Sequence, residues 1–192
     1  MKKIAALGLA LILSACTTVT HIEGEQRLGN RLSVTLPQAW NKFSQPASVP
    51  YEVWTQEGIM LDQLRIWAAI APEQALIVKP ADNGQKAEKV PVFTPGLRPD
   101  QWVSLLERVY VAEGSVVKVD KVEPTTWAGG KAVRFELSMT RKNDDLAFQA
   151  VGWATEQDQR FYAMVFTAPR LHFFGQWLPK VEAIVQSVRI TL

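Results

Sequence analysis

The residue with the clearest chemical potential is Cys16, the only cysteine in the chain. Two lysines precede an apolar run over residues 4–13, and the small residues Ser14 and Ala15 come directly before the thiol. This order of charged, apolar and small segments is typical of a secretory signal peptide. The apolar run is about half the ~20 residues that a membrane-spanning helix needs. The segment therefore predicts export followed by cleavage.

The ending Leu-Ser-Ala-Cys at residues 13–16 resembles the lipobox of bacterial lipoproteins. The resemblance implies that residues 1–15 are removed and that Cys16 becomes the first mature residue and carries acyl chains such as palmitate. Two or more acyl chains anchor a protein stably, since each buried methylene contributes about 0.8 kcal/mol. Thr17 follows the cysteine, where an Asp would hold an enterobacterial lipoprotein in the inner membrane. The resemblance thus implies an outer-membrane lipoprotein whose domain faces the periplasm. An ordinary signal peptide with an unmodified cysteine is the alternative.

The charge of the mature chain excludes one class of partner. Cleavage removes two lysines and no acid, so the basic residues fall from 21 to 19 and equal the 19 acidic residues. A near-neutral chain gives no electrostatic support for nucleic-acid binding. Once Cys16 is acylated, no internal disulfide is possible, and the apolar core must hold the domain together. Residues 31–192 are long enough for one such domain, and the polar stretch 16–30 predicts a flexible tether of roughly 20 Å reach.

Few other residue types point to catalysis or metal binding. His172 lies beside aromatic residues, which favours a structural role over that of a general base. The His-Ile-Glu triplet at 21–23 has metal-binding side chains, but a flexible tether cannot fix their geometry. The Asn-Asp-Asp triplet at 143–145 lacks the spacing of a calcium loop and fits a hairpin turn. The glycine pair 129–130 lacks the rest of a phosphate-binding loop. We therefore expect no metal and no cofactor, and we favour a protein that is not an enzyme.

Two carboxylates and two tryptophans leave an alternative open. Asp62 and Glu136 lie on predicted strands, where they could act as acid and base if they faced one cleft. Trp54 and Trp67 could line that cleft or a partner-binding patch, or they could pack in the core, which the doubly apolar strand around Trp67 favours. A cleft of this composition would belong to a periplasmic small-ligand-binding protein or a hydrolase.

The hydrophobic pattern predicts an α+β fold. Alternating residues predict strands over 32–36, 51–58, 59–71, 115–122, 131–141, 146–155, 160–168 and 189–192. One amphipathic helix starts at Pro99 and carries the apolar stripe Trp102, Leu105, Leu106 and Val109. A second carries Leu178, Val181, Ile184, Val185 and Val188, with Pro179 in its first turn or at a kink. Short turns between the later strands predict an antiparallel sheet made from about six of these strands, with helices packed on its faces.

The order of these elements resembles the PsbP-like fold, an α/β/α sandwich. The resemblance rests on the opening strand that runs into Pro37-Gln38-Ala39-Trp40, on the Gly-Gly turn before Lys131-Ala132-Val133, and on the closing IVQSVRI, and it covers residues 31–192. The fold includes the photosystem subunit PsbP, a Ran-binding import factor and bacterial lipoproteins of the DcrB type. Because these proteins mostly bind other proteins, the resemblance implies a non-catalytic binding or accessory module for an envelope protein.

The segment 72–98 is the predicted partner-binding region. Its four prolines break every periodicity, and long irregular loops are commonly functional. Val90, Val92 and Phe93 would serve as apolar anchors, and Arg98 would belong to their charged rim. The alternative is that residues 90–93 pair with a sheet edge and shield it.

Overall fold

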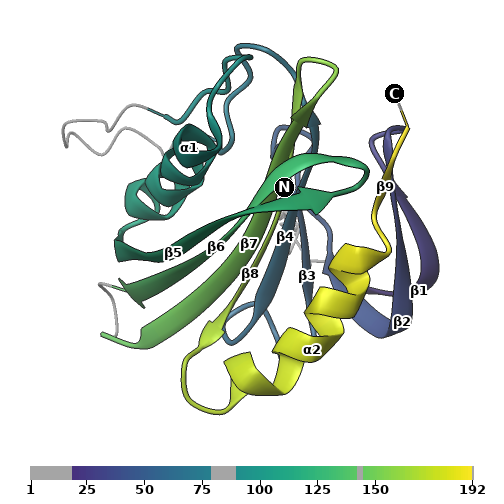
Figure 1. Cartoon of the computed structure of the whole chain (residues 1–192). Coiled ribbons are helices and arrows are strands. Elements are labelled where there is room, and N and C mark those ends of the chain that lie inside the picture. The colour runs from purple at the N-terminus through teal and green to yellow at the C-terminus, as the bar shows by residue number, and fades with distance from the viewer. Residues whose placement is uncertain (1–18, 79–89, 142–144, 192) are drawn as a thin grey trace, which may run out of the picture.

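The computed structural model of the chain describes residues 19–78, 90–141 and 145–191 (Figure 1). Three sequence-based expectations lie outside these residues. They are the signal segment 1–15, the acylation of Cys16, and most of the acidic turn at 143–145.

One antiparallel sheet of nine strands forms the centre of the protein. The strands are β1 (Val19–Leu28), β2 (Leu32–Phe43), β3 (Glu52–Thr55), β4 (Gln63–Ile70), β5 (Ser115–Trp127), β6 (Gly130–Arg141), β7 (Ala147–Gln157), β8 (Arg160–Pro169) and β9 (Arg189–Ile190). Their order across the sheet is β1-β2-β3-β4-β8-β7-β6-β5, and β9 pairs with β2. The antiparallel α+β architecture is as expected, but the expected number of about six strands is too low.

The polar stretch expected to be a flexible tether forms β1 instead. Val19 pairs with Phe43 and Leu28 pairs with Leu32, so β1 runs along the whole length of β2. Most β1 side chains are exposed or half-buried because the strand lies at the edge of the sheet. Backbone hydrogen bonds hold such an edge strand in place without an alternating apolar pattern. Residues 19–28 are therefore part of the sheet, although the domain was expected to begin at residue 31.

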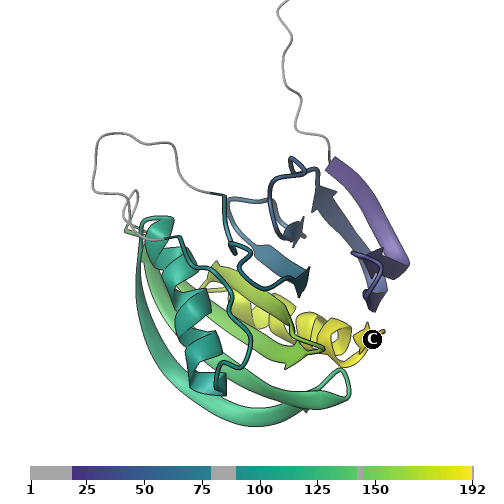
Figure 2. The same ribbon diagram turned by 90° about the horizontal axis from the view of Figure 1, so that it is seen from above.

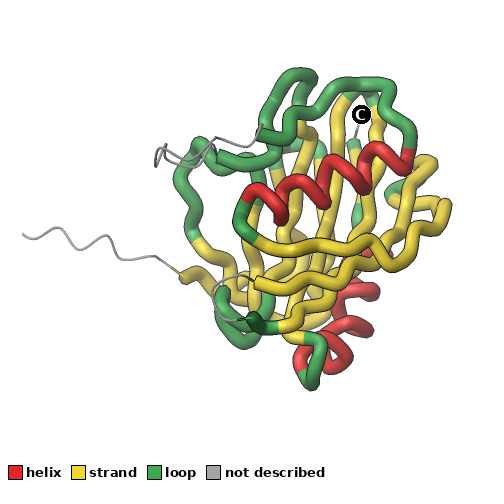
Figure 3. The backbone as a smooth tube through the Cα atoms, turned by 90° about the vertical axis from the view of Figure 1, so that its left-hand side faces the viewer, coloured by secondary structure: helices red, strands yellow, loops and turns green. Residues whose placement is uncertain are grey.

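Two helices, α1 (Pro99–Ala112) and α2 (Phe173–Gln186), cover opposite faces of the sheet (Figures 2 and 3). Successive residues of β8 alternate between the two cores. Phe161, Ala163 and Val165 pack on the α1 side, and Tyr162, Met164 and Phe166 pack on the α2 side. All four residues of the predicted α1 stripe are buried. Pro179 lies inside α2 and not in its first turn. Because proline has no N–H, the helix lacks the backbone hydrogen bond from residue 179 to the carbonyl of Gly175.

A bulge in β4 changes which residues share a face. Leu64 and Ile66 pack on the α2 side, whereas Trp67 and Ile70 pack on the α1 side. Between Trp67 and Ile70 the pairing with β8 shifts by a residue position, and Ala69 adopts a positive φ of 59°. An extra residue in a strand reverses the alternation beyond it. A regular alternation over residues 64–70 would place Ile70 with Leu64 and Ile66, and the bulge moves it to the opposite face.

The region after β4 packs against the α1 face as a short irregular layer. Ala75 and Val92 form an isolated antiparallel bridge, and the N–H of Phe93 donates to the carbonyl of Gln74 at 3.0 Å. Phe93 is fully buried, and its ring stacks on Phe161 with a centroid distance of 5.5 Å. The ordered end of this segment therefore completes the core.

Candidate functional site

A pocket of about 140 Å³ lies beside the C-terminal end of α1. One wall is the turn between β3 and β4, with Ile59 and Met60, and another is the start of β4. The last turn of α1 and the adjoining ends of β5, β6 and β7 complete it. Cavities of roughly 150 Å³ are large enough to hold a benzene ring. The pocket can therefore hold a small ring or the end of a short apolar chain.

Local structure at the end of α1 brings these parts together. Glu113 caps the helix, and its N–H donates to the carbonyl of Val109 at 3.1 Å. Gly114 then adopts a φ of +92°, a left-handed conformation that glycine adopts far more readily than other residues. β5 starts at the next residue, Ser115, which also lines the pocket. The tight turn thus places the last side chains of α1 beside the first residues of β4.

Arg65 is held at the base of this site by an ion pair. Its Nη1 atom lies 2.8 Å from Oε1 and 2.7 Å from Oε2 of Glu113, and its Nε donates to Oε1 of Gln63 at 2.9 Å. The guanidinium carbon also lies 5.1 Å from the ring centre of Tyr51 and 5.2 Å from that of Tyr110. Burial opposes the charge of Arg65, but the carboxylate of Glu113 outweighs it and raises the pKa of Arg65 above its ordinary value. Arg65 is therefore a fixed cation.

Tyr110 contributes a hydroxyl that lacks a partner. The residue is 4% exposed and lines the pocket, and its hydroxyl forms no hydrogen bond within the part of the chain that the structure describes. Burial raises the pKa of Tyr110, so the hydroxyl keeps its proton at physiological pH. A buried polar group without a partner destabilises a fold by about 1–3 kcal/mol. Such a group in a pocket is a natural donor to a bound acceptor atom.

The mouth of the pocket combines apolar surface with a second arginine. Met60 is 66% exposed. The guanidinium of Arg141 lies 4.3 Å from the ring centre of Phe148, and its Nη1 donates to the carbonyl of Met60 at 3.1 Å. Met60, Arg141 and Phe148 all line the pocket. An apolar rim beside a cation favours a ligand that is itself partly apolar and partly charged.

The two carboxylates that the sequence suggested as an acid and base do not form a pair. Asp62 accepts hydrogen bonds from Oγ1 of Thr55 at 2.6 Å and from the N–H groups of Gln56 and Glu57 at 2.8 and 2.7 Å. Burial raises the pKa of Asp62, and these three bonds oppose that effect. Glu136 instead accepts from Arg134 at 2.7 Å. Asp62 therefore closes the β3–β4 turn, and Glu136 belongs to a surface ion-pair cluster.

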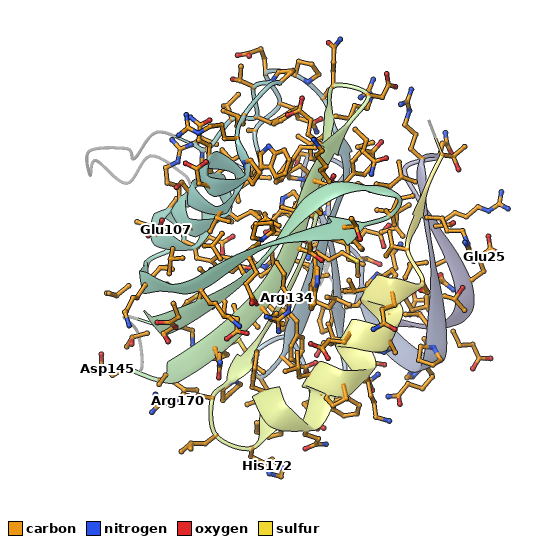
Figure 4. All side chains as sticks on the ribbon, viewed as in Figure 1. Glu25, Glu107, Arg134, Asp145, Arg170 and His172 are labelled. Atoms are coloured by element: carbon orange, nitrogen blue, oxygen red, sulfur yellow. The ribbon has the colours of Figure 1, made fainter. Side chains whose placement is uncertain are left out.

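The alternative cleft lined by tryptophans and carboxylates is also absent from the described residues. Trp54 and Trp67 are buried in the two separate cores on opposite faces of the sheet, as the core alternative required. His172 is exposed in the loop before α2, away from the sheet (Figure 4). No cluster of three or more potential metal-binding side chains occurs in the described part of the chain.

The predicted partner-binding residues do not form one exposed surface. Val92 is 37% exposed and Val90 is half-buried, but Phe93 is fully buried. Arg98 is exposed and its Nη2 pairs with Asp100 at 2.9 Å. Phe93 is therefore wrong as a partner anchor, because its side chain points into the core. The burial of Phe93 fits the alternative that residues 90–93 shield the sheet.

Sequence reasoning missed Arg65, Tyr110 and Glu113. Arg65 gave one usable signal, since it is a lone charge within the apolar stretch LRIWAAI, whose strand was expected to be covered on both faces. A buried charge needs a counter-charge. Nothing in the sequence names Glu113 as that counter-charge, because 48 residues separate the two.

Comparisons with known proteins support the architecture. No protein-family model matches the chain, and no curated protein matches its sequence. The solution structure of the cyanobacterial PsbP protein, CyanoP, from Synechocystis sp. PCC 6803 aligns with a TM-score of 0.55 at 10% identity, over 96% of this chain and 99% of that one. The Saccharomyces cerevisiae Ran-binding protein Mog1p aligns with a TM-score of 0.52 at 9% identity, over 91% of this chain and 96% of that one.

The chain has a PsbP-like fold. The resemblance seen in the sequence is confirmed to this extent, and identities this low show the fold alone. Membership of the DcrB-type lipoproteins stays a prediction. None of the helices within residues 19–78, 90–141 and 145–191 is long and apolar enough to cross a membrane.

Proposed function

We propose that this protein is a lipoprotein of the cell envelope, anchored through acylated Cys16 to the periplasmic side of the outer membrane. Its PsbP-like domain acts as a non-catalytic binding or accessory module for an envelope protein. The lipobox-like ending and charged N-terminal segment support the anchor. The fold is compatible with a binding role, since Mog1p is a Ran-binding protein with the same architecture. Fold likeness alone does not identify a partner.

The pocket beside α1 is the observation that carries the binding role. It is lined by the exposed side chain of Met60 and by the buried hydroxyl of Tyr110, which has no hydrogen-bond partner among the described residues. Interfaces concentrate their affinity where an anchoring group enters a desolvated pocket. Hydroxyls line the pocket at Ser115 and Thr167, but none of the described lining residues is a histidine or a cysteine. The lining thus supports binding better than acyl-transfer chemistry.

A small free ligand is the second candidate. The pocket volume of about 140 Å³ suits a compound of ring size as well as one side chain of a protein. The earlier hypothesis placed such a ligand in a cleft lined by Trp54, Trp67 and paired carboxylates, which the structure does not contain. The pocket at Arg65 and Tyr110 replaces that cleft as the binding site for this candidate.

Photo-crosslinking in cells tests the proposed function. A benzophenone amino acid replaces Met60 at the pocket mouth in the full-length, acylated protein. The control position is Val122, which is 43% exposed and lies seven residues along β5 from Ser115, roughly 23 Å away. We expect a discrete cross-linked protein at position 60 only, and we expect Ile59→Trp, which narrows the pocket, to abolish it. Equal products at both positions, or a product that survives Ile59→Trp, would contradict a partner at the pocket.

A further inference from the structure

A hollow of about 460 Å³ lies between the β1–β2 hairpin and β4, at a gap in the sheet. β3 is four residues long and pairs with β4 only as far as Ile66, so no described strand lies along this edge of β4 beyond that point. Glu52, the first residue of β3, lines the hollow, and Gly29 in the β1–β2 turn lies against the carbonyl of Ala68. The volume falls within the range of roughly 300–1,000 Å³ that is usual for small-ligand sites.

We propose that this hollow binds an uncharged sugar, whose hydroxyl and amide groups form hydrogen bonds with side chains of the loop between β2 and β3. The lining shares no residue with the pocket beside α1. The inference therefore goes beyond the proposed function, and the two can fail independently.

The charged side chains of the lining neutralise each other. Nζ of Lys42 lies 2.8 Å from Oε2 of Glu52, and the same oxygen accepts from Nε1 of Trp54 at 3.0 Å. No other described residue of the lining carries a charge. An ionic ligand would have to break this pair or lie in the hollow without a counter-charge, which is unfavourable once the ligand is desolvated. The lining therefore favours a ligand without net charge.

Polar groups that both donate and accept line the hollow. The side chains of Ser44, Gln45 and Ser48, all in the loop between β2 and β3, form no hydrogen bond with the described residues. Oε1 of Gln74 accepts from the N–H of Ala71 at 2.9 Å, which leaves its Nε2 as a donor. Hydroxyl and amide groups on a ligand match this lining, because each of them can donate and accept. An entirely apolar ligand would leave these side chains unpaired.

A bulge argues against an extended peptide as the occupant. A peptide strand would need a regular row of backbone donors and acceptors along the free edge of β4. Ala69 interrupts that row with its φ of 59°, and its carbonyl accepts from Nη1 of Arg160 at 3.3 Å. A compact ring needs no such row. Phe43, Pro46 and Val49 offer apolar surface to the C–H groups of a sugar ring.

Fluorine NMR of the phenylalanines gives a local readout of binding. The chain has eight phenylalanines, of which Phe43 lines the hollow and Phe161 is fully buried on the α1 side. The full-length acylated protein, labelled with para-fluorophenylalanine and held in a detergent without a sugar headgroup, is titrated with glucose, N-acetylglucosamine, glucosamine and glucuronate. These sugars share one type of ring. The first two are neutral, the third is cationic and the fourth is anionic. Phe43→Tyr assigns the Phe43 signal, and Phe161 reports nonspecific effects.

We expect a neutral sugar to shift the Phe43 signal saturably in the millimolar range while the Phe161 signal stays unchanged. Glucosamine and glucuronate should bind clearly more weakly. Gln45→Leu should weaken the neutral sugar about fivefold, the effect of losing one hydrogen bond between uncharged groups. Gln176→Leu is the matched control, because it makes the same change on the exposed side of α2 and should leave the affinity within about twofold. Neither variant should lower the melting temperature clearly, since neither glutamine side chain bonds to the described residues.

Three results would overturn the sugar inference. They are equal binding of neutral and charged sugars, unchanged affinity in Gln45→Leu, and a Phe43 signal that neither neutral sugar shifts. N-acetyl-trialanine amide, a neutral peptide, tests the rejected occupant. A shift of the Phe43 signal by this peptide at the same concentration as the sugar would assign the hollow to a peptide instead. The proposed function is tested separately, through the cross-link at position 60, and no result of the sugar titration changes that outcome.

Discussion

The Nη1 atom of Arg65, near the start of β4, lies within 2.8 Å of both carboxylate oxygens of Glu113, the residue that caps α1. The side chain of Arg65 is 12% exposed and that of Glu113 is 29% exposed. Removal of one partner from a desolvated pair leaves the other charge uncompensated. Because Glu113 keeps some contact with water, Glu113→Gln should lower the free energy of unfolding by about 1–3 kcal/mol. Urea denaturation of the purified protein measures this change.

Glu107→Gln is the matched control for that prediction. Glu107 lies on the outer side of the same helix (Figure 4) and forms no ion pair with any described residue. Its replacement should change the free energy of unfolding by less than about 0.5 kcal/mol. Equal effects of the two substitutions would show that the Arg65–Glu113 pair does not join β4 to α1 energetically.

Gly152 and Phe135 form directly opposed partners on β7 and β6. A methyl group added at Gly152 would overlap Cζ of Phe135, because the ring covers the glycine. Gly152→Ala should therefore destabilise the protein by about 1–3 kcal/mol through overpacking. Thermal or urea denaturation measures the loss. In the background of Phe135→Leu, which removes the ring, the same alanine should have a clearly smaller effect. Additive effects would mean that the ring and the glycine are not coupled.

Neighbouring residues at the end of the irregular segment should behave oppositely. Phe93 is fully buried and stacks on Phe161, whereas Val92 is 37% exposed. Phe93→Ala should lower the free energy of unfolding by about 3–5 kcal/mol, the range for removing a buried aromatic side chain. Val92→Ala should change it by less than about 0.5 kcal/mol. A folded, stable Phe93→Ala variant that has lost a binding partner would restore the idea that Phe93 is an anchor.

The lipid anchor is tested at the cysteine itself. Cys16→Ser keeps the size of the side chain but removes the thiol that we propose takes up the diacylglyceryl group. Cells that express this variant should incorporate no radiolabelled palmitate into the protein, and the protein should leave the membrane fraction or keep its signal segment. Normal palmitate labelling of Cys16→Ser would rule out acylation at this residue.

The strands and helices that bury an alternating or amphipathic side-chain pattern were predictable from the sequence. Val133, Phe135, Leu137 and Met139 all pack on the α1 side, as their spacing of two predicts. The pattern failed where the backbone, not the side chains, determines the structure. β1 is polar because it is an edge strand, and Ile70 changes faces because Ala69 lies in a bulge. Neither feature produces a periodic pattern of apolar side chains in the sequence.

The candidate site was less predictable than the fold. Its residues come from a turn, a strand, a helix end and the sheet rim, so no short motif contains them. Residue types with well-known chemistry drew attention in the sequence to Asp62, Glu136 and His172. The structure uses Asp62 to close a turn and Glu136 in an ion pair. The hydroxyl of Tyr110 became visible as a feature only once its surroundings were known.

The position at which β1 starts limits how far this domain can stand from a bilayer. Val19 is already paired with Phe43, and it follows Cys16 by only three residues. If Cys16 carries the lipid, those three residues span at most about 10 Å, since an extended chain covers roughly 3.3–3.6 Å per residue. The domain would then rest against the lipid headgroups, with the β1–β2 end of the sheet nearest the membrane. It could not swing out to meet components deep in the periplasm. A partner would have to be embedded in the same membrane or diffuse along its surface.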